Sequence, residues 1–285
     1  MSLLARGVFV FGAGKVGRAL AAALRRRAIP VTLRAARRGW PSRPLVAGIV
    51  VVAVRDGDVP KVAARAAELG VIPRTAVCVH VAGALDADAL APLRGHVAGV
   101  AQMHPMISFA STTFVPDLSR GHVHVRGDAV AERAARTLAR SIGMVPRTFP
   151  RLDTIGYHAS AGLVANGAAA LAASGVELLV RSGVPREDAP KMLGPLLRSV
   201  AENVEHLGLP SALTGPVRRG DPGAVARHLT TIEARLPSLA ELYVTLVGAQ
   251  VPIAKRIGEA PPAAFDALET WVRKAAARAR RRGRP

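Results

Sequence analysis

Residues 8–20 read VFVFGAGKVGRAL, and no other stretch constrains the fold as strongly. A β-branched and aromatic run leads into three glycines in GxGxxG spacing, and an Ala/Leu-rich helical pattern follows. Strand, glycine turn and helix in this order are the context that a dinucleotide-binding fingerprint requires. The first glycine permits the tight turn, the second lets the backbone approach a pyrophosphate, and the third lets the helix pack closely on the strand. We expect cofactor contacts from Gly12, Ala13, Gly14, Lys15, Val16 and Gly17, the alternative being a glycine turn without a ligand.

Strand-like runs alternate with helical patterns through the first half of the chain. Runs such as GIVVVAV are apolar on both faces, as the strands of a parallel sheet covered by helices must be. The sequence therefore predicts an N-terminal α/β Rossmann domain over residues 1–150, with a doubly wound, mainly parallel sheet. The strands are expected at 8–12, 29–34, 45–54, 75–81, 96–103 and 122–126, and a helix is expected at 128–143.

After residue 153 the pattern changes to helices almost without strands, expected at 154–182, 186–206, 222–235, 237–249 and 262–280. Residues 151–285 are therefore predicted to form an all-α domain that ends in a basic, frayed tail. The apolar stretch 159–180 contains Asn166 and Glu177, so we interpret it as a buried core helix rather than a membrane span.

The formal net charge is +19, and seven basic residues without any acidic one fall in the last 14 positions, which leaves +12 on the rest. This excess should attract anionic ligands such as nucleotides. No aromatic residues interleave with the arginines of the tail, so binding of nucleic acid is disfavoured. The sequence shows no signal peptide, and its single cysteine, Cys78, lies in an expected buried strand, so a cytoplasmic protein is expected.

The end of the second expected strand indicates which dinucleotide is bound. NAD sites usually place Asp or Glu there, about 20 residues after the glycines. Here the first acidic residue is Asp56, and the segment reads TLRAARRGW. Arginines can pair with a 2′-phosphate, so the pattern favours NADP over NAD. The candidates are Arg34, Arg37 and Arg38, of which at least one is expected to be only a solvated surface charge.

Residues after the third expected strand extend this site. Val54, Arg55 and Asp56 come at the carboxyl end of the sheet, where ligands bind in open α/β folds, so we expect them to line the nicotinamide-ribose channel. The alternative is that Asp56 or Asp58 only caps the next helix. Metal binding is not expected, because His122 and His124 share one strand face without a further ligand nearby in the sequence.

Three further segments, MHPMISFA (103–110), GYHASAGLVANGAAAL (156–171) and LTGPVRRGDPGAVARHL (213–229), carry a specific likeness together with GAGKVGRAL and HVAGA. The chain resembles the Rossmann-like proteins whose C-terminal part is domain-of-unknown-function family 2520. These are similar in architecture to pyrroline-5-carboxylate reductase, prephenate dehydrogenase and the 6-phosphogluconate dehydrogenase group. The resemblance implies an NADP-dependent oxidoreductase fold, a helical domain that forms a homodimer, and no established substrate. This sequence departs from the family at Ala82, where a serine is usual.

Candidate catalytic residues come from these segments. His104 follows the fifth expected strand, and an unperturbed imidazole titrates near neutral pH, so it can give or take a proton. His158 and Asn166 fall close to one face of the first long helix, and Asn166 needs hydrogen bonds if it is buried. His104 and Asn166 each have a structural alternative: a loop histidine that bonds backbone carbonyls, and an asparagine that bonds a neighbouring helix.

The LTGPVRRGD loop supplies the candidate substrate-binding residues. Arginine beside a helix N-terminus forms an anion site, so Arg219 is expected to hold a carboxylate or phosphate of the substrate, with Thr214 and Asp221 on the same loop. The alternatives are a solvated loop charge for Arg219 and a plain helix cap for Asp221. The sequence thus predicts an NADP-dependent oxidoreductase that acts on a carbonyl or imine carbon of a small, anionic metabolite. A non-catalytic NADP-binding sensor or assembly protein is the alternative.

Overall fold

The computed structural model describes residues 2–119 and 121–282. The chain divides into two units, Met1–Ala165 and Asn166–Pro285. The last strand ends at Arg147 and the long helix α4 begins at Thr154, so the change from α/β to helical structure falls near residue 150. The first unit nevertheless includes the start of α4. The expected domain boundary at residue 150 stays a prediction.

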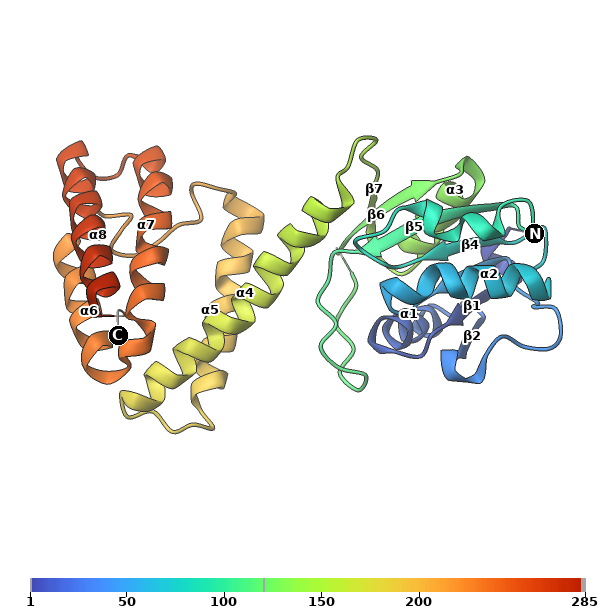
Figure 1. Ribbon diagram of the computed structural model, residues 1–285, viewed down its shortest axis with the longest axis horizontal. Helices are drawn as coiled ribbons and strands as arrows, with labels where there is room; N and C mark the ends of the chain where they lie inside the picture. The colour runs from blue at the N-terminus through green and yellow to red at the C-terminus, as the bar shows by residue number, and fades with distance from the viewer. Residues whose placement is uncertain (1, 120, 283–285) are drawn as a thin grey trace. The chain divides into compact units, whose positions relative to one another are not determined.

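Within the described residues, seven strands form one sheet in the order β2-β1-β3-β4-β5-β6-β7 (Figure 1). Every neighbouring pair is parallel except β5 and β6, which confirms the doubly wound, mainly parallel sheet. The final strand was not predicted, because three residues with a central proline show no periodic pattern. The strands are β1 Val8–Phe11, β2 Val31–Arg34, β3 Ile49–Val52, β4 Val77–His80, β5 Gly99–Pro105, β6 His122–Gly127 and β7 Val145–Arg147.

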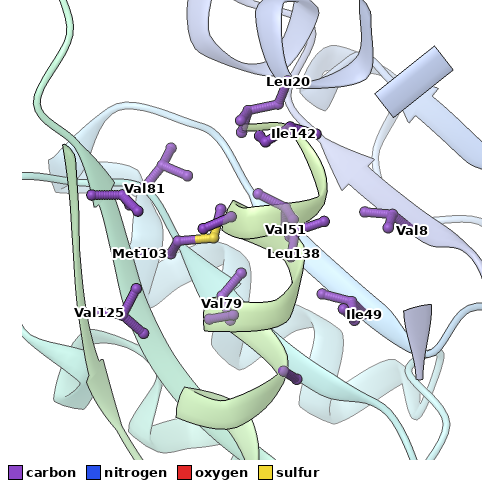
Figure 2. Close-up of a cluster of buried hydrophobic side chains, with 14 of the residues drawn as sticks. Val8, Leu20, Ile49, Val51, Val79, Val81, Met103, Val125, Leu138 and Ile142 are labelled. Atoms are coloured by element: carbon purple, nitrogen blue, oxygen red, sulfur yellow. The ribbon is translucent and has the colours of Figure 1, made fainter. Parts of the chain in front are cut away.

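Helices cover both faces of the sheet, which explains why its central strands are apolar on both sides. On one face, α1 (Lys15–Arg26) and α3 (Ala129–Ser141) pack Leu20 and Leu138 against strand residues such as Val51, as Figure 2 shows. On the other face, α2 (Val59–Leu69) and the 3-10 helix η4 (Ala87–Leu93) cover the alternate strand positions. Cys78 is buried in this second layer, as predicted.

The second unit contains α5 (Ala189–Leu207), α6 (Pro222–Arg235), α7 (Ala240–Ile257) and α8 (Pro262–Arg282). Its core joins Val225 of α6, Val251 of α7 and Leu268 of α8. Helix α7 continues past its predicted end and through Pro252, because Val251 and Ala254 on this last part are buried in the core. The frayed tail was expected after residue 280, but α8 continues as helix to Arg282, and residues 283–285 lie outside the described residues.

The expectation of a buried core helix at 159–180 is wrong for this chain taken alone. Helix α4 (Thr154–Arg181) has no buried residue, and Leu163 and Val164 are 77% and 71% exposed. Within the described residues it is the one helix long and apolar enough to cross a membrane, although core helices of soluble proteins pass the same test. The apolar pattern indicated that α4 needs covering, but the residues that the structure describes bury none of its side chains.

Candidate functional site

A cavity of about 1340 Å³ runs along the carboxyl ends of β2, β1, β3, β4 and β5. Ligands of open α/β sheets bind at this edge. Residues of the first unit line it, and the strand order separates two groups of side chains. Arg37, Lys61 and Arg65 form what we term the cationic end, next to β2 and α2. His104 and His158 form the histidine end, next to β4 and β5.

The glycine turn lies between these two ends, and its geometry suits a bound pyrophosphate. Gly12 has φ +119°, and a Cβ added there would overlap the carbonyl oxygen of Ala53. A Cβ at Gly17 would overlap the carbonyl oxygen of Gly12, so this glycine allows α1 to pack against β1. Gly14 faces open space and precedes the first residue of α1. The predicted contacts Gly12, Ala13, Gly14, Lys15 and Val16 line the cavity, whereas Gly17 supports it from behind.

The three predicted arginines have different surroundings. Arg37 lines the cavity, but Arg34 and Arg38 do not. The Arg34 side chain donates hydrogen bonds to the carbonyl oxygens of Gly39 (2.6 Å) and Arg38 (2.9 Å), so it holds the loop after β2 in place. This loop presents Trp40, whose ring stacks on Phe11 with centroids 4.0 Å apart.

Three cations that line the cavity were not predicted: Arg18 of α1, and Lys61 and Arg65 of α2. The Trp40 indole donates to the carbonyl oxygen of Val62 at 3.1 Å, which ties the β2 loop to helix α2. Lys61 and Arg65, one helical turn apart on α2, line the cavity beside this contact. Arg65 also pairs with Glu68 at 2.8 Å, both side chains being exposed. The sequence shows that Lys61 and Arg65 are spaced to share one helix face. It does not show that the loop after β2 contacts this face.

Val54, Arg55 and Asp56 line the cavity after β3, at the positions the sequence indicated. Asp56 and Asp58 lie in the 3-10 helix η3 (Asp56–Asp58), and neither caps a helix through its side chain. The Asp56 carboxylate instead acts electrostatically on His80 and His104, where it partly offsets the lowering of their pKa values by burial.

At the histidine end, His104 of β5 and His158 of α4 meet across Gly83. Their ring centroids are 5.7 Å apart in an edge-to-face arrangement. A Cβ added at Gly83 would overlap Nδ1 of His158 and lie 2.7 Å from Nε2 of His104. The structure therefore brings two predicted residues together and adds Gly83, whose lack of a side chain lets the imidazoles approach the backbone.

Two buried polar residues hold the backbone before Gly83. His80 accepts a hydrogen bond at Nδ1 from the Ala82 amide (3.2 Å), which leaves Nε2 as the donor to the Asp86 carbonyl oxygen (2.7 Å). Gln102 donates to the Ala82 carbonyl oxygen at 2.9 Å. The sequence analysis did not name His80 or Gln102. A polar residue near the end of an apolar, buried strand could have indicated them. They position Ala82 and Gly83 rather than line the cavity.

The electrostatics of His104 differ from the expectation. Burial, and to a smaller extent the nearby His158, lower the pKa of His104 to about 4, so the imidazole is neutral at pH 7. An unperturbed pKa was expected for His104, because the sequence does not show that the end of β5 is buried. Neutral His104 can accept a proton, or donate one as a neutral N–H group.

The other predicted residues belong to the second unit. Asn166 is exposed on α4, so the argument from its burial does not hold within this chain. Asp221 caps α6 by accepting a hydrogen bond from the Ala224 amide at 2.8 Å. Arg218 bonds the carbonyl oxygens of Ser211 and Leu213 and pairs with Glu259. The proposed roles of Asn166, Thr214, Arg219 and Asp221 toward a substrate stay predictions.

The two histidines of β6 have different environments. His122 is exposed and accepts a hydrogen bond from Arg147 (3.2 Å), whereas His124 is 2% exposed. Among residues 2–119 and 121–282, no group of three or more His, Cys, Asp or Glu side chains is placed to hold a metal ion.

Comparison with known proteins supports the resemblance seen in the sequence. Residues 122–251, from β6 into α7, match the family described as Domain of unknown function (DUF2520). No curated protein sequence is similar enough to this chain to count as a match.

Solved structures share the fold at low sequence identity. A candidate NADP oxidoreductase from Bacteroides fragilis has a TM-score of 0.68 at 20% identity, over 87% of this chain and 99% of that one. Pyrroline carboxylate reductase from Plasmodium falciparum, with NADP bound, has 0.60 at 13% identity, over 98% and 100%. An imine reductase variant from Myxococcus stipitatus, in complex with NAD⁺, has 0.50 at 17% identity, over 85% and 94%. The chain is therefore a Rossmann-fold protein with a helical C-terminal region, and its residues 122–251 match the DUF2520 family.

Proposed function

We propose that this protein is an NADP-dependent oxidoreductase that acts on a carbonyl or imine carbon of a small, anionic metabolite. The observation that carries the proposal is a single cavity with a glycine turn at its middle, cations at one end and paired histidines at the other. When bound, the nicotinamide supplies or accepts a hydride. The names of structural neighbours, which include NADP and imine reductases, support an oxidoreductase in general terms.

The cationic end supports NADP over NAD. Lys61 and Arg37 make no ion pair with any described residue, so their charges are available to a 2′-phosphate, and Arg65 adds a third charge beside Glu68. Because Arg34 bonds the backbone of the loop, its expected contact with the phosphate is replaced by a supporting role. Phosphate favours such a cluster, whereas the ribose 2′-hydroxyl of NAD gains little from it.

At the other end, the neutral His104 would exchange a proton with the reacting oxygen or nitrogen. An anionic substrate stabilises an imidazolium and would raise the pKa of His104 from its low value. His158 would orient the reacting group, Asn166 would polarise it, and Arg219, with Thr214 and Asp221 on its loop, would hold the anionic end. These roles rest on the sequence arguments above.

A fluorescence titration and a turnover screen test the proposal. We expect NADPH to bind more tightly than NADH, and turnover with a member of a panel of cyclic imines, keto acids and 2-hydroxy acids. On a substrate so found, His104→Ala should lower kcat by about 100-fold or more, since a lost general acid or base costs 10²–10⁴. Equal affinity for NADPH and NADH would contradict the assignment of NADP. Full turnover by His104→Ala would contradict the role of His104.

The second candidate is a non-catalytic NADP-binding sensor or assembly protein. One observation favours it: Ala82, at the cavity beside Gly83, has a methyl group where the family usually has a serine hydroxyl. Tight binding of NADPH without turnover across the whole panel would support this candidate. Introducing the hydroxyl with Ala82→Ser is the matched test, because a gain of turnover would show that only this group is missing.

We further propose that a second copy of this chain covers α4 and α5. Both helices expose apolar residues, Leu163 and Val164 on α4 and Leu196 and Val200 on α5, and exposed apolar residues gathered on one helix mark an interface. Sedimentation should show a dimer that Leu163→Lys dissociates. Val46→Lys, at a residue of the first unit that is 96% exposed, should leave the dimer intact. We expect the assembled protein in the cytoplasm, without nucleic-acid or membrane partners.

A further inference from the structure

Behind His104, on the side away from Gly83, lies a second group of aromatic polar residues that the proposed function does not use. His104 of β5 pairs directly with His124 of the antiparallel strand β6, so the two side chains lie on the same face of the sheet. The ring of Tyr157, on α4, contacts both histidines, with centroids 5.5 Å from His104 and 5.8 Å from His124. His104 lines the cavity, whereas His124 and Tyr157 do not.

Three imidazole nitrogens in this group are buried without a hydrogen-bond partner among the described residues. They are Nδ1 of His104 and both ring nitrogens of His124. The hydroxyl of Tyr157 also bonds no described residue. Leaving a buried polar group unpaired destabilises the fold, so several such groups in one place need an explanation. A polar site with this many donors and acceptors can hold an ordered water molecule.

The two nitrogens of His104 face different surroundings. Nε2 lies next to Gly83, where the cavity and His158 are. Nδ1 is buried and is the atom that lacks a partner. An imidazole that is hydrogen-bonded on both sides can release a proton from one nitrogen while it takes one up at the other.

We infer that Tyr157 forms a proton relay behind His104 through one buried water molecule that His124 helps to hold, and that the relay delivers a proton to Nδ1 of His104 as Nε2 releases one. In the reducing direction, the Nε2–H bond of His104 breaks and its proton goes to the substrate nitrogen or oxygen. Nδ1 takes a proton from the water, the water takes one from the Tyr157 hydroxyl, and half-buried Tyr157 regains one from solvent. His104 ends as the other neutral tautomer, and the hydride comes from the cofactor of the proposed function.

The relay removes a difficulty of the proposed function. His104 has a pKa of about 4, so an imidazolium donor is scarce at neutral pH. Exchange between neutral tautomers needs no imidazolium. Burial also lowers the pKa of His124 and raises that of Tyr157, so both stay neutral: Tyr157 passes the proton on, and His124 hydrogen-bonds the water. The charged or titratable groups that act on His104 are His158, Asp56, His124 and His80.

The chain contains a reference pair for this contact. Nδ1 of His228 and the hydroxyl of Tyr243 are 3.0 Å apart, with ring centroids at 6.1 Å and planes at 69°. His104 and Tyr157 have a similar edge arrangement, 5.5 Å and 80°. These two tyrosines are the only ones in the sequence, so replacing each with phenylalanine gives matched variants.

Nitrogen NMR of histidine-labelled, full-length protein tests the relay without a substrate. The shifts of Nδ1 and Nε2 report the tautomer and hydrogen bonding of each of the 8 histidines, and His104→Gln assigns the His104 signals. We expect Nδ1 of His104 to be hydrogen-bonded in the wild type. Tyr157→Phe and His124→Gln should each shift Nδ1 of His104, and Tyr243→Phe should shift Nδ1 of His228 alone.

The controls separate the relay from general disturbance of the fold. His122→Gln removes an exposed histidine two residues from His124 and should leave His104 unchanged. Tyr157→Phe removes only a hydroxyl and keeps the ring contacts. It therefore still tests the relay if the His124→Gln variant does not fold. The inference is overturned if His104 does not respond to Tyr157→Phe while His228 responds to Tyr243→Phe.

The relay rests on the proposed function for its purpose, and a kinetic arm keeps the two distinguishable. With a substrate in hand, Tyr157→Phe should lower kcat by about tenfold and leave the KM for NADPH unchanged. If the wild type turns over no substrate of the panel but shows the expected NMR shifts, the result counts against the proposed function alone. Normal kcat in Tyr157→Phe would count against the relay alone.

Discussion

The two ends of the cavity differ in electrostatics: one has exposed, charged side chains and the other a neutral imidazole. At the cationic end, Arg37, Lys61 and Arg65 are exposed and carry full charges in water. At the histidine end, burial keeps His104 neutral, and it also lowers the pKa values of His80 and His124, which do not line the cavity. Exposed charges attract a phosphate at little cost in stability, because folding does not remove them from water. Neutral buried imidazoles hold protons at fixed positions instead, which is what chemistry on a small substrate needs.

The histidine end predicts the largest effect, a loss of stability in acid. His104 has a pKa of about 4 in the fold and about 6.5 when unfolded, so the unfolded chain takes up the proton first as pH falls. Stability is therefore present above pH 6.5 and is lost down to pH 4, by roughly 3 kcal/mol for this residue. Urea unfolding at pH 7 and pH 4 measures the loss. Between these pH values the free energy of unfolding of His104→Asn should fall by that much less than the free energy of the wild type. Equal losses would mean that His104 is not buried as described.

The glycine turn between the two ends predicts the next largest effect. Gly17→Ala forces a methyl group against the carbonyl oxygen of Gly12, which we expect to cost about 2 kcal/mol of unfolding free energy. Gly14→Ala is the control, because its methyl group would meet open space. It should keep near wild-type stability and bind NADPH more weakly, since the methyl group projects where the pyrophosphate would approach. Similar stability of both variants in urea unfolding would contradict this picture of the turn.

The cationic end predicts a smaller effect, confined to one cofactor. Arg37→Ala and Lys61→Ala should each weaken NADPH binding by about fivefold and leave NADH binding unchanged, because exposed charge pairs contribute modestly. Arg38→Ala, outside the cavity, is the matched control. Fluorescence titrations at low and high salt should show the difference shrinking as salt screens the charges. An equal loss of NADH affinity would place these residues away from the 2′-phosphate.

The smallest effect on stability is expected at Gly83. In Gly83→Ala the two imidazole rings must move, and side chains shift more easily than backbone, so stability should change by less than about 1 kcal/mol. The pKa of His104 should rise toward 6.5 as its ring leaves its buried position beside His158. A pH titration followed by NMR measures it, with Gly57→Ala, which meets open space, as the control. An unchanged pKa would show that Gly83 does not set this geometry.

The sequence predicted the fold well where the physical signal was local. Apolar β-branched runs and helix starts located β1 to β6 and α6, and the glycine spacing located the turn. The burial of α4 was predicted wrongly, because an apolar pattern states that a helix needs covering without stating what covers it. His80 and Gln102 were missed because their role depends on backbone atoms of residues 82–86, which the sheet brings next to them.

The sequence by itself determined the Rossmann sheet, the position of the dinucleotide turn and the surplus of positive charge, since each depends on neighbouring residues. Only the tertiary structure decided which cations face the cavity, because Arg34 turns to its own loop while Lys61 arrives from α2. It also decided that His104 is neutral and is placed beside His124 and Tyr157. Burial and contact between distant segments arise from packing of the whole unit, and no local pattern of residues encodes them.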